Sequence, residues 1–480
     1  MRPLLLSFVV ALAGCSFTTG SNFTECTADV DCGSAAACMK HYCLPLPPGC
    51  RRSEPGGTKN PFTVPGRVPL VAILPVTTDN GETDDSEIQS INAMNLAISQ
   101  ANERLADHLF GLFVCDTGAK VDGGGLDVQA SWFVANLHAP VFIVSSSSPT
   151  NALAQNAARL DAGSLIISPN ATSSELRVRH ATLGNVWRVA PPDTGQAKVL
   201  ADLIKQAFPD GGTSPDGGMD AGVAARAKIA IIHTTSIYGT GFANPLNQEL
   251  SSRGFDTEQI PFDSNDTTQR SAAVRRAASV TPTATVVIGN SSHLVEFVTT
   301  ARTSLPELTR DAGHRWFLTD GLKDPSILTD VTRPELTAAL GTAPAQGAGA
   351  AYSIFRTSFT NKYGLDPDTT NYTSHSYDTA WLVMLATQYA LANTPDGGEL
   401  SGARIGEGMT RFATSSGPAI PFTAEKWTEL ADALSRGTTT NVEGTSGPLD
   451  FDADAGVPQA PYEIWQVADG GIRVVRQVWP

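Results

Sequence analysis

Residues 68–76 read VPLVAILPV, an aliphatic run in which polar residues do not alternate with apolar ones. Such continuous hydrophobicity is typical of a strand covered on both faces, as in a parallel sheet. Similar runs follow: LFGLFVCD (109–116), PVFIVSS (140–146), SLIISP (164–169), AKIAIIHT (227–234), ATVVIGN (284–290) and RWFLTD (315–320). The sequence therefore predicts a folded body built on parallel strands that begins near Val68.

Amphipathic helical patterns separate these runs. One apolar stripe is Ile88, Ile91, Met94 and Ile98, behind a predicted capping box of Ser86 and Gln89, and another is Leu200, Leu203, Ile204 and Phe208. Alternating strands and helices predict an α/β protein, and two such series predict two lobes.

The first fifteen residues have the pattern of a bacterial lipoprotein signal. Arg2 is followed by an apolar run from Leu4 to Ala13 and by the lipobox Leu12-Ala13-Gly14-Cys15. The run is too short for a membrane span, which needs ~20 residues. We expect residues 1–14 to be removed and Cys15 to anchor the protein in the cell envelope as a periplasmic or outer-membrane lipoprotein. The alternative is an ordinary secretory peptide.

Six further cysteines suit an exported protein with disulfide bonds: Cys26, Cys32, Cys38, Cys43, Cys50 and Cys115. A zinc site is the alternative, but no CxxC pair occurs and His41 is the one histidine in the cluster. Four of the clustered cysteines could pair among themselves, leaving the fifth for Cys115. Residues 15–65 are rich in Gly, Pro, Ser and Cys, which indicates a disulfide-bonded stub and a linker.

The charge distribution and the loops point away from two classes of partner. The net charge is −15, and the basic residues form only short pairs such as Arg51-Arg52, which disfavours nucleic acid. Insertions rich in Asp and Gly at 209–222, 395–398 and 469–471 lack calcium-loop spacing, so we interpret them as solvated loops.

Familiar catalytic motifs are missing from the sequence. The serines at 145–148 are not in a GxSxG elbow, and Gly239-Thr240-Gly241 lacks the third glycine of a dinucleotide site. The eight histidines occur without HExxH or another pair at metal-ligand spacing. We expect a binding protein that is not an enzyme and that has no cofactor or metal.

The ordered segments resemble the leucine/isoleucine/valine-binding family, the type I periplasmic receptors of ABC importers for branched-chain amino acids. The resemblance covers about 66–480. It is carried by these pieces in family order: PVFIVSSSS, LIISPNATSSEL, NVWRVAPPDTGQAKVLADLI, KIAIIHTTSIYGTGFANPL, TVVIGNSSHLVEFVTTAR, FLTDG, HSYDTAWLVMLA and SGPLDFDADAG.

The resemblance implies two lobes joined by three crossovers, each lobe a parallel sheet flanked by helices. The first lobe would hold 66–190 and 352–445, and the second 191–351 and 446–480. Ligand would bind in the cleft at the carboxyl ends of the strands, and the lobes would close around it by a hinge motion.

Two loops are predicted to bind the ligand's α-carboxylate. The serines at 145–148 follow one strand and open a helix, so backbone N–H groups favour an anion there. The resemblance carries this role onto Ser145 or Ser146 and onto Thr172 of Asn170-Ala171-Thr172. The alternative for Thr172 is to cap a helix that begins near Ser174.

Four further residues enter the predicted site through the resemblance. Tyr238 and Tyr377 would line the cleft with aromatic rings, although a core position is an equal alternative for Tyr377. Asn290 stands where the leucine-binding proteins carry an aromatic residue, which admits a more polar ligand. Asp320 would pair with the ligand's α-ammonium, and its alternative is a turn-forming Asp before Gly321.

The function implied is capture of an amino acid or similar small carboxylate for an ABC importer, with the lipid anchor holding the receptor near its permease. The alternative is a non-transport sensing or assembly lipoprotein of the same fold at the outer membrane. The cysteine-rich stub and Ser16, which is not an inner-membrane retention signal, motivate that alternative.

Overall fold

The computed structural model describes residues 24–64, 66–78, 81–118, 125–156, 163–180, 184–209, 226–394, 399–412, 417–451, 460–468 and 470–480. The predicted signal peptide, Cys15, the insertion at 395–398 and most of that at 209–222 lie outside these residues. Within them, no helix has the length and hydrophobicity needed to span a membrane.

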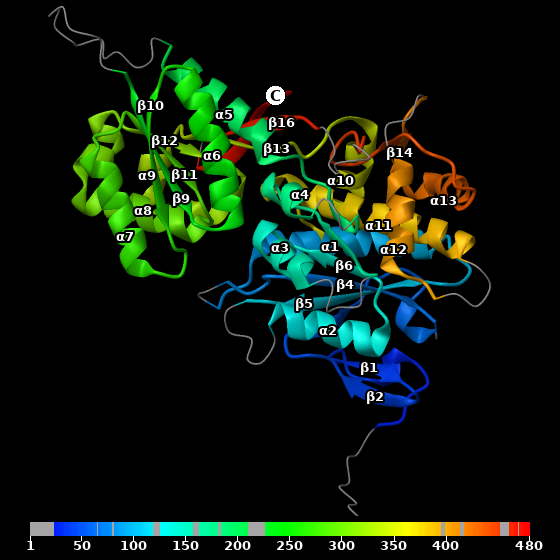
Figure 1. Cartoon of the computed structure of the whole chain (residues 1–480). Coiled ribbons are helices and arrows are strands. Elements are labelled where there is room, and N and C mark those ends of the chain that lie inside the picture. The colour runs from blue at the N-terminus through cyan, green and yellow to red at the C-terminus, as the bar shows by residue number, and fades with distance from the viewer. Residues whose placement is uncertain are drawn as a thin grey trace, which may run out of the picture.

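Lobe 1 is built on a six-stranded sheet of order β3-β5-β4-β6-β7-β8 (Figure 1). Its strands are β3 (Cys50–Ser53), β4 (Val68–Leu74), β5 (Phe110–Asp116), β6 (Val141–Val144), β7 (Leu165–Ser168) and β8 (Val186–Arg188). All pair in parallel except β3, which runs antiparallel to β5.

Helices cover both faces of this sheet. One face packs on α1 (Asp85–Asn102), α10 (Gly349–Tyr363), α11 (Thr373–Asn393), α12 (Gly402–Met409) and α13 (Trp427–Ser435), and the other on α2 (Leu126–Leu137) and α3 (Ser147–Asn156). Leu70, Ala72 and Leu74 face the first group, whereas Val71 and Ile73 face the second. Burial on both sides explains why the run at 68–76 contains no polar residue.

The predicted capping box of Ser86 and Gln89 is wrong. Helix α1 begins after Asp84, whose carboxylate accepts hydrogen bonds from the N–H groups of Ser86 and Glu87. An Asp one residue before the helix satisfies these donors directly and adds a favourable charge at the helix N-terminus.

Lobe 2 is built on a seven-stranded sheet of order β10-β9-β11-β12-β13-β16-β17. Its strands are β9 (Lys228–Thr234), β10 (Asp256–Phe262), β11 (Ala284–Ile288), β12 (Arg315–Leu318), β13 (Leu340–Pro344), β16 (Tyr462–Ala468) and β17 (Gly471–Val478). The first five pair in parallel, as expected, and β16 and β17 add two antiparallel strands beside β13.

Helices also sandwich the lobe 2 sheet. The helices are α5 (Asp193–Ala207) and α6 (Ile237–Ser252) on one face and α7 (Thr267–Ser279) and α8 (Ser291–Ser304) on the other. The chain passes between the lobes three times: between β8 and α5, between β13 and α10, and between β15 (Val442–Glu443) and β16. The result is a two-lobed α/β architecture with three crossovers (Figure 1).

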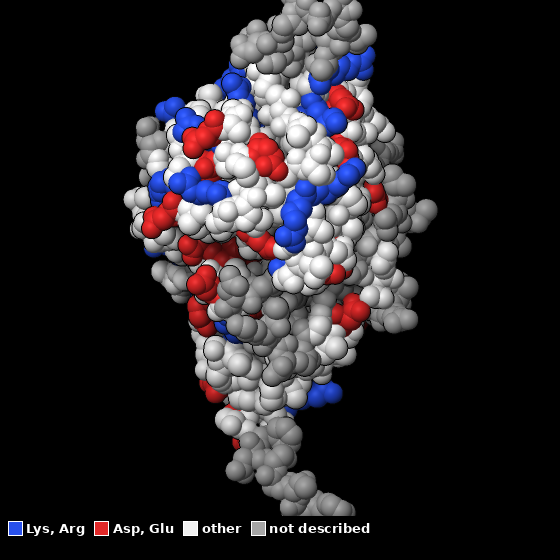
Figure 2. Space-filling model, turned by 90° about the vertical axis from the view of Figure 1, so that its left-hand side faces the viewer, with Lys and Arg blue, Asp and Glu red and all other residues white. Residues whose placement is uncertain are grey.

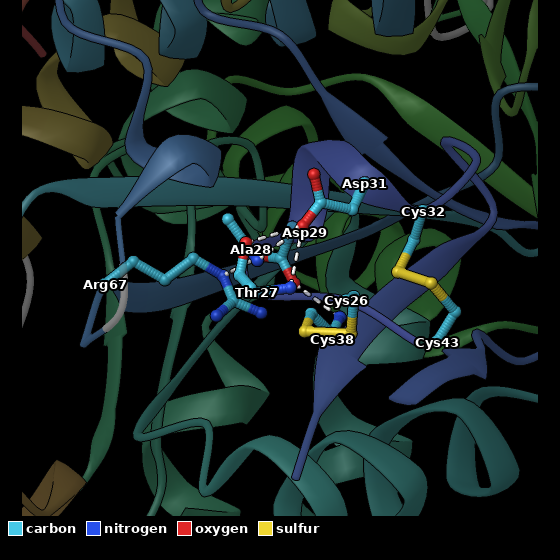
Figure 3. Close-up of a disulfide and its surroundings, with 9 residues drawn as sticks. All are labelled: Cys26, Thr27, Ala28, Asp29, Asp31, Cys32, Cys38, Cys43 and Arg67. Carbon is cyan, nitrogen blue, oxygen red and sulfur yellow. Dashed lines mark hydrogen bonds and ion pairs between the residues drawn. A yellow bond between two sulfur atoms is a disulfide. The ribbon is translucent and has the colours of Figure 1, made fainter. Parts of the chain in front are cut away.

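An N-terminal module, residues 24–64, packs on the end of lobe 1 that lies away from lobe 2 and contributes β3 to the lobe 1 sheet (Figure 1). Its hairpin of β1 (Ala36–Met39) and β2 (Tyr42–Pro45) is held by the disulfides Cys26–Cys38 and Cys32–Cys43 (Figure 3). A third disulfide, Cys50–Cys115, joins β3 to β5. Every cysteine sulfur that the structure describes is therefore in a disulfide rather than available as a metal ligand.

A buried ion pair ties this module to the lobe. Arg67 Nε lies 2.7 Å from Asp29 Oδ2, and the side chains are 12% and 2% exposed (Figure 3). Asp29 Oδ1 also accepts the backbone N–H of Cys38 at 2.6 Å, and the Arg67 guanidinium lies 5.2 Å from the ring centroid of Phe113. Part of the predicted linker is therefore ordered and docked on lobe 1. The sequence did not predict strand β3, because this strand has only four residues and lies next to Pro- and Gly-rich sequence.

We expect the Cys50→Ala/Cys115→Ala double variant to lose up to about 4 kcal/mol of unfolding free energy, because the disulfide closes a loop with a sequence separation of 65. Urea denaturation of the whole protein, with a probe of unfolding in lobe 1, measures this loss. The matched control, Cys26→Ala/Cys38→Ala, opens a loop with a separation of 12 and should loosen only the N-terminal module. Equal destabilisation of lobe 1 by both variants would contradict the assignment.

Candidate functional site

A cavity of about 360 Å³ lies between the lobes, at the carboxyl ends of the parallel strands. Lobe 1 and the start of α11 contribute Glu87, Ser145, Ser146, Ser147, Ser148, Asn170, Thr172 and Tyr372. Lobe 2 contributes Thr234, Ser236, Tyr238, Ser264, Gly289, Asn290, His293, Asp320 and Gly321. Strand-end loops of both sheets therefore meet in one place, as open α/β sheets allow.

On the lobe 1 side, Asn170 holds the serine loop in position. Its side-chain N–H donates to the Ser145 hydroxyl at 2.8 Å, and its side-chain oxygen accepts the Ser146 N–H at 2.5 Å. Ser146 adopts a left-handed conformation, with φ of 71°, directly before α3 begins at Ser147. The first N–H groups of α3 have no acceptor within their own helix, so they favour an anion in the cavity.

Thr172 lies in this wall and is 1% exposed. Helix α4 (Glu175–His180) begins one residue later than expected, and the Glu175 N–H donates a hydrogen bond to the Ser173 hydroxyl at 3.3 Å. The predicted capping role of Thr172 is therefore taken by Ser173. Ala171, which precedes Thr172 in the same loop, is fully buried and does not line the cavity.

On the lobe 2 side, Asp320 is 5% exposed and accepts three side-chain hydrogen bonds. Tyr238 and Gln196 donate to Oδ1 at 2.9 and 3.1 Å, and Tyr372 donates to Oδ2 at 2.6 Å. Burial raises the pKa of Asp320, and these donors oppose the rise. An ammonium group placed here would favour the ionised carboxylate.

Asp320 also starts a turn, as its alternative interpretation requires. The Lys323 N–H donates to the Asp320 carbonyl at 3.1 Å. A Cβ on Gly321 would lie 2.5 Å from the carbonyl oxygen of Gly289, so glycine is needed where the two loops approach. Asp320 therefore forms the turn with its backbone and lines the cavity with its side chain.

A second buried acid, Asp193 of α5, lies close to Asp320 without lining the cavity. Burial raises its pKa, and the charge of Asp320 adds to the rise. The charge of the Arg188 guanidinium lowers the pKa of Asp193. This guanidinium donates to the carbonyl oxygens of Thr172 and Ser173 at 2.9 and 2.6 Å. The sequence pattern did not single out Asp193, which looks like an ordinary acid in the first turn of a helix.

Asn290 reaches the cavity rim and caps α8. Its side-chain oxygen accepts the His293 N–H at 3.1 Å. Tyr238 and Asn290 thus lie beside the cavity where the sequence placed them.

Tyr377 does not reach the cavity. It is 2% exposed, its ring centroid lies 4.9 Å from that of Phe355, and its hydroxyl donates to Gln100 at 2.5 Å. Its position is in the core of lobe 1, the alternative that the sequence left open. The aromatic residue that this segment contributes to the cavity, beside Tyr238 of lobe 2, is Tyr372, which precedes α11 in a left-handed conformation with φ of 65°.

The titratable side chains that line the cavity are mainly acidic. Glu87 and Asp320 line it, and no Lys or Arg does among the described residues. Burial raises the pKa of Glu87 to about 8. On the face of the molecule in Figure 2, by contrast, basic and acidic side chains are intermixed. The charges on that face therefore do not indicate a binding site, whereas the residues that line the cavity do.

Solved structures share this fold. A leucine-binding protein from Thermotoga maritima is 16% identical, with a TM-score of 0.62 over 86% of this chain and 99% of that one. A branched-chain amino acid transporter substrate-binding protein from Streptococcus pneumoniae, in complex with isoleucine, is 16% identical, with a TM-score of 0.60 over 86% and 100%. A solute-binding protein from R. palustris, in complex with benzoate, is 15% identical, with a TM-score of 0.57 over 86% and 97%.

These similarities confirm the predicted two-lobed type I periplasmic-binding-protein fold. The comparison with curated proteins gives no match. The family model described as the receptor family ligand binding region matches residues 227–470, just over half of the chain. The chain therefore belongs to this family of receptor ligand-binding regions.

Proposed function

We propose that this protein is an extracytoplasmic solute receptor that captures an amino acid or a similar small carboxylate between its lobes. One observation carries the proposal: the N-terminus of α3 and the carboxyl group of Asp320 line the same cavity. The first suits a carboxylate and the second an ammonium group. The isoleucine and benzoate complexes of structurally similar proteins support a ligand of this size and class.

In the proposed complex, the ligand's α-carboxylate accepts hydrogen bonds from the first turn of α3 and from the Thr172 hydroxyl. Its α-ammonium donates to Asp320, where Tyr238 and Tyr372 already fix the carboxyl group. Binding groups from both lobes would stabilise a closed arrangement, because the ligand has more contacts there than with either lobe alone. The protein binds and releases its ligand without chemical conversion.

We further propose that the receptor serves an ABC importer and is anchored through Cys15. The substrate-binding proteins with a similar fold support the first part. A second candidate is a sensing or assembly lipoprotein at the outer membrane. The N-terminal module favours this candidate, because it is docked on lobe 1 and offers a surface for a partner protein. Fractionation of inner and outer membranes separates the two candidates.

A thermal-shift screen of the purified protein against amino acids, small carboxylates and short peptides tests the proposed function. A ligand present at a hundredfold over its Kd should add about 2.7 kcal/mol to stability. We expect amino acids to be among the stabilising compounds. A screen in which only compounds without an amino group stabilise the protein would exclude amino-acid capture.

Asp320→Asn should weaken binding of an amino acid by about 3 kcal/mol or more, because the ammonium would lose its charged partner in a buried site. The des-amino analogue of the same ligand should lose little affinity. Isothermal titration calorimetry with both ligands measures the difference. The paired variant Thr172→Val should weaken both ligands alike, by about 1.5–3 kcal/mol, because both carry the carboxylate. An equal response of the two ligands to Asp320→Asn would make Asp320 a turn residue only.

Cys15→Ala should leave the protein unprocessed or released from the membrane, because the lipobox cysteine is the residue that would be acylated. Membrane fractionation and the mass of the mature N-terminus check this outcome. Normal cleavage with continued membrane attachment would show that the anchor lies elsewhere.

A further inference from the structure

Glu87 is a cavity residue that the proposed function does not use. It is the third residue of α1 and is 6% exposed. Its Oε1 accepts the Ser145 hydroxyl at 2.5 Å, but its Oε2 is buried and has no hydrogen-bond partner in the protein. A buried polar atom without a partner is unfavourable, so a donor from a molecule in the cavity would stabilise it.

The charges around Glu87 show which kind of donor it lacks. Burial is the main cause that raises the pKa of Glu87, and the Ser145 hydrogen bond lowers it. The acidic side chains of Asp84, which caps α1, and Asp116, at the end of β5, add to the rise. Across the cavity lie Asp320 and the imidazole of His293. No Lys or Arg among the described residues lines this space. A cationic group on the ligand would supply the missing charge partner.

The rest of the lining disfavours an aliphatic ligand. Among the described residues that line the cavity, none is Leu, Ile, Val, Met or Phe, whereas most carry a hydroxyl or amide group. An aliphatic side chain would cover these polar groups without replacing their contacts with water. A ligand with a polar end would keep them satisfied.

We propose that Glu87 binds a cationic nitrogen on the ligand's side chain, so that the cavity selects an amino acid with a basic side chain over an aliphatic one. This inference rests on the proposed amino-acid capture, in which α3 and Asp320 hold the α-carboxylate and α-ammonium. Glu87 belongs to lobe 1 and Asp320 to lobe 2. The two nitrogens of such a ligand therefore pair with acids on opposite lobes and hold the lobes together.

Lysine and norleucine form a matched pair for the test, because norleucine has the same carbon chain without the side-chain amine. By calorimetry at pH 8, the purified protein should bind lysine about 10- to 100-fold more tightly. Glu87→Gln should abolish this preference by bringing the affinity for lysine down to that for norleucine. The control is Asp85→Asn, which removes an exposed acid from the same helix turn and should keep the preference.

Proton release gives an independent measurement. With a pKa of about 8, Glu87 holds a proton in the ligand-free protein at pH 7 and must lose it to pair with a cation. Lysine affinity should therefore fall as the pH drops below 8, by at most about tenfold per pH unit. Titrations at pH 7 in two buffers of different ionisation enthalpy should show up to one proton released per lysine. Glu87→Gln should lose that release, which separates Glu87 from His293 and the other acids.

Three outcomes distinguish failure of this inference from failure of the proposed function. If amino acids bind with Asp320 dependence but lysine and norleucine bind equally, the Glu87 inference is overturned and the proposed function stands. If 1,5-diaminopentane binds with Glu87 dependence while no amino acid binds, the proposed function fails and Glu87 still binds a cation. If none of these compounds binds, both are wrong.

Discussion

The carboxyl group of Asp320 is bound by residues from both lobes, and the shape of the cavity depends on these bonds. Tyr238 and Gln196 reach it from lobe 2, while Tyr372 reaches it from the start of α11. Asn371 also donates to its backbone carbonyl. A carboxyl group at this depth needs such donors, because burial without them is costly. The same bonds hold the two walls of the cavity against each other, so a ligand that engages Asp320 acts at the point where the lobes are already joined.

The construction of the two sheets gathers polar side chains at the cavity. Helices cover both faces of each sheet, so the strand interiors are apolar, as β4 shows. Hydroxyl, amide and carboxyl side chains occur where strands end and helices begin, and these ends face each other across one cavity. Most of the residues that line the cavity consequently carry a hydroxyl, amide or carboxyl group, and none of those described is Leu, Ile, Val, Met or Phe. Fold similarity and ligand identity are separate questions here, because fewer than one residue in five is shared with the solved structures.

Strands buried on both sides were predictable because double burial leaves a continuous apolar run, as at 68–76 and 227–234. Strand β10, with the sequence DTEQIPF, was not, because it lies at a sheet edge with polar residues outward. The position of Asp320 at the cavity was predictable from the family resemblance together with its place at a strand end. The choice between a cleft and a core position for Tyr377 depended on where α11 begins and which way it faces, and both are set by tertiary packing. Glu87 left no signal, because acids are common in the first turn of any helix.

The added strand β3 also has a consequence for handling the protein in reducing solution. Without it, β5 would be the outer strand of lobe 1, and every residue of β5 is buried. An uncovered, apolar outer strand of this kind is a template for pairing with another molecule. The Cys50–Cys115 bond keeps β3 in place over it. Reduction of this disulfide would thus expose the edge of the sheet to self-association. Oxidation to the disulfide would protect the molecule from aggregation.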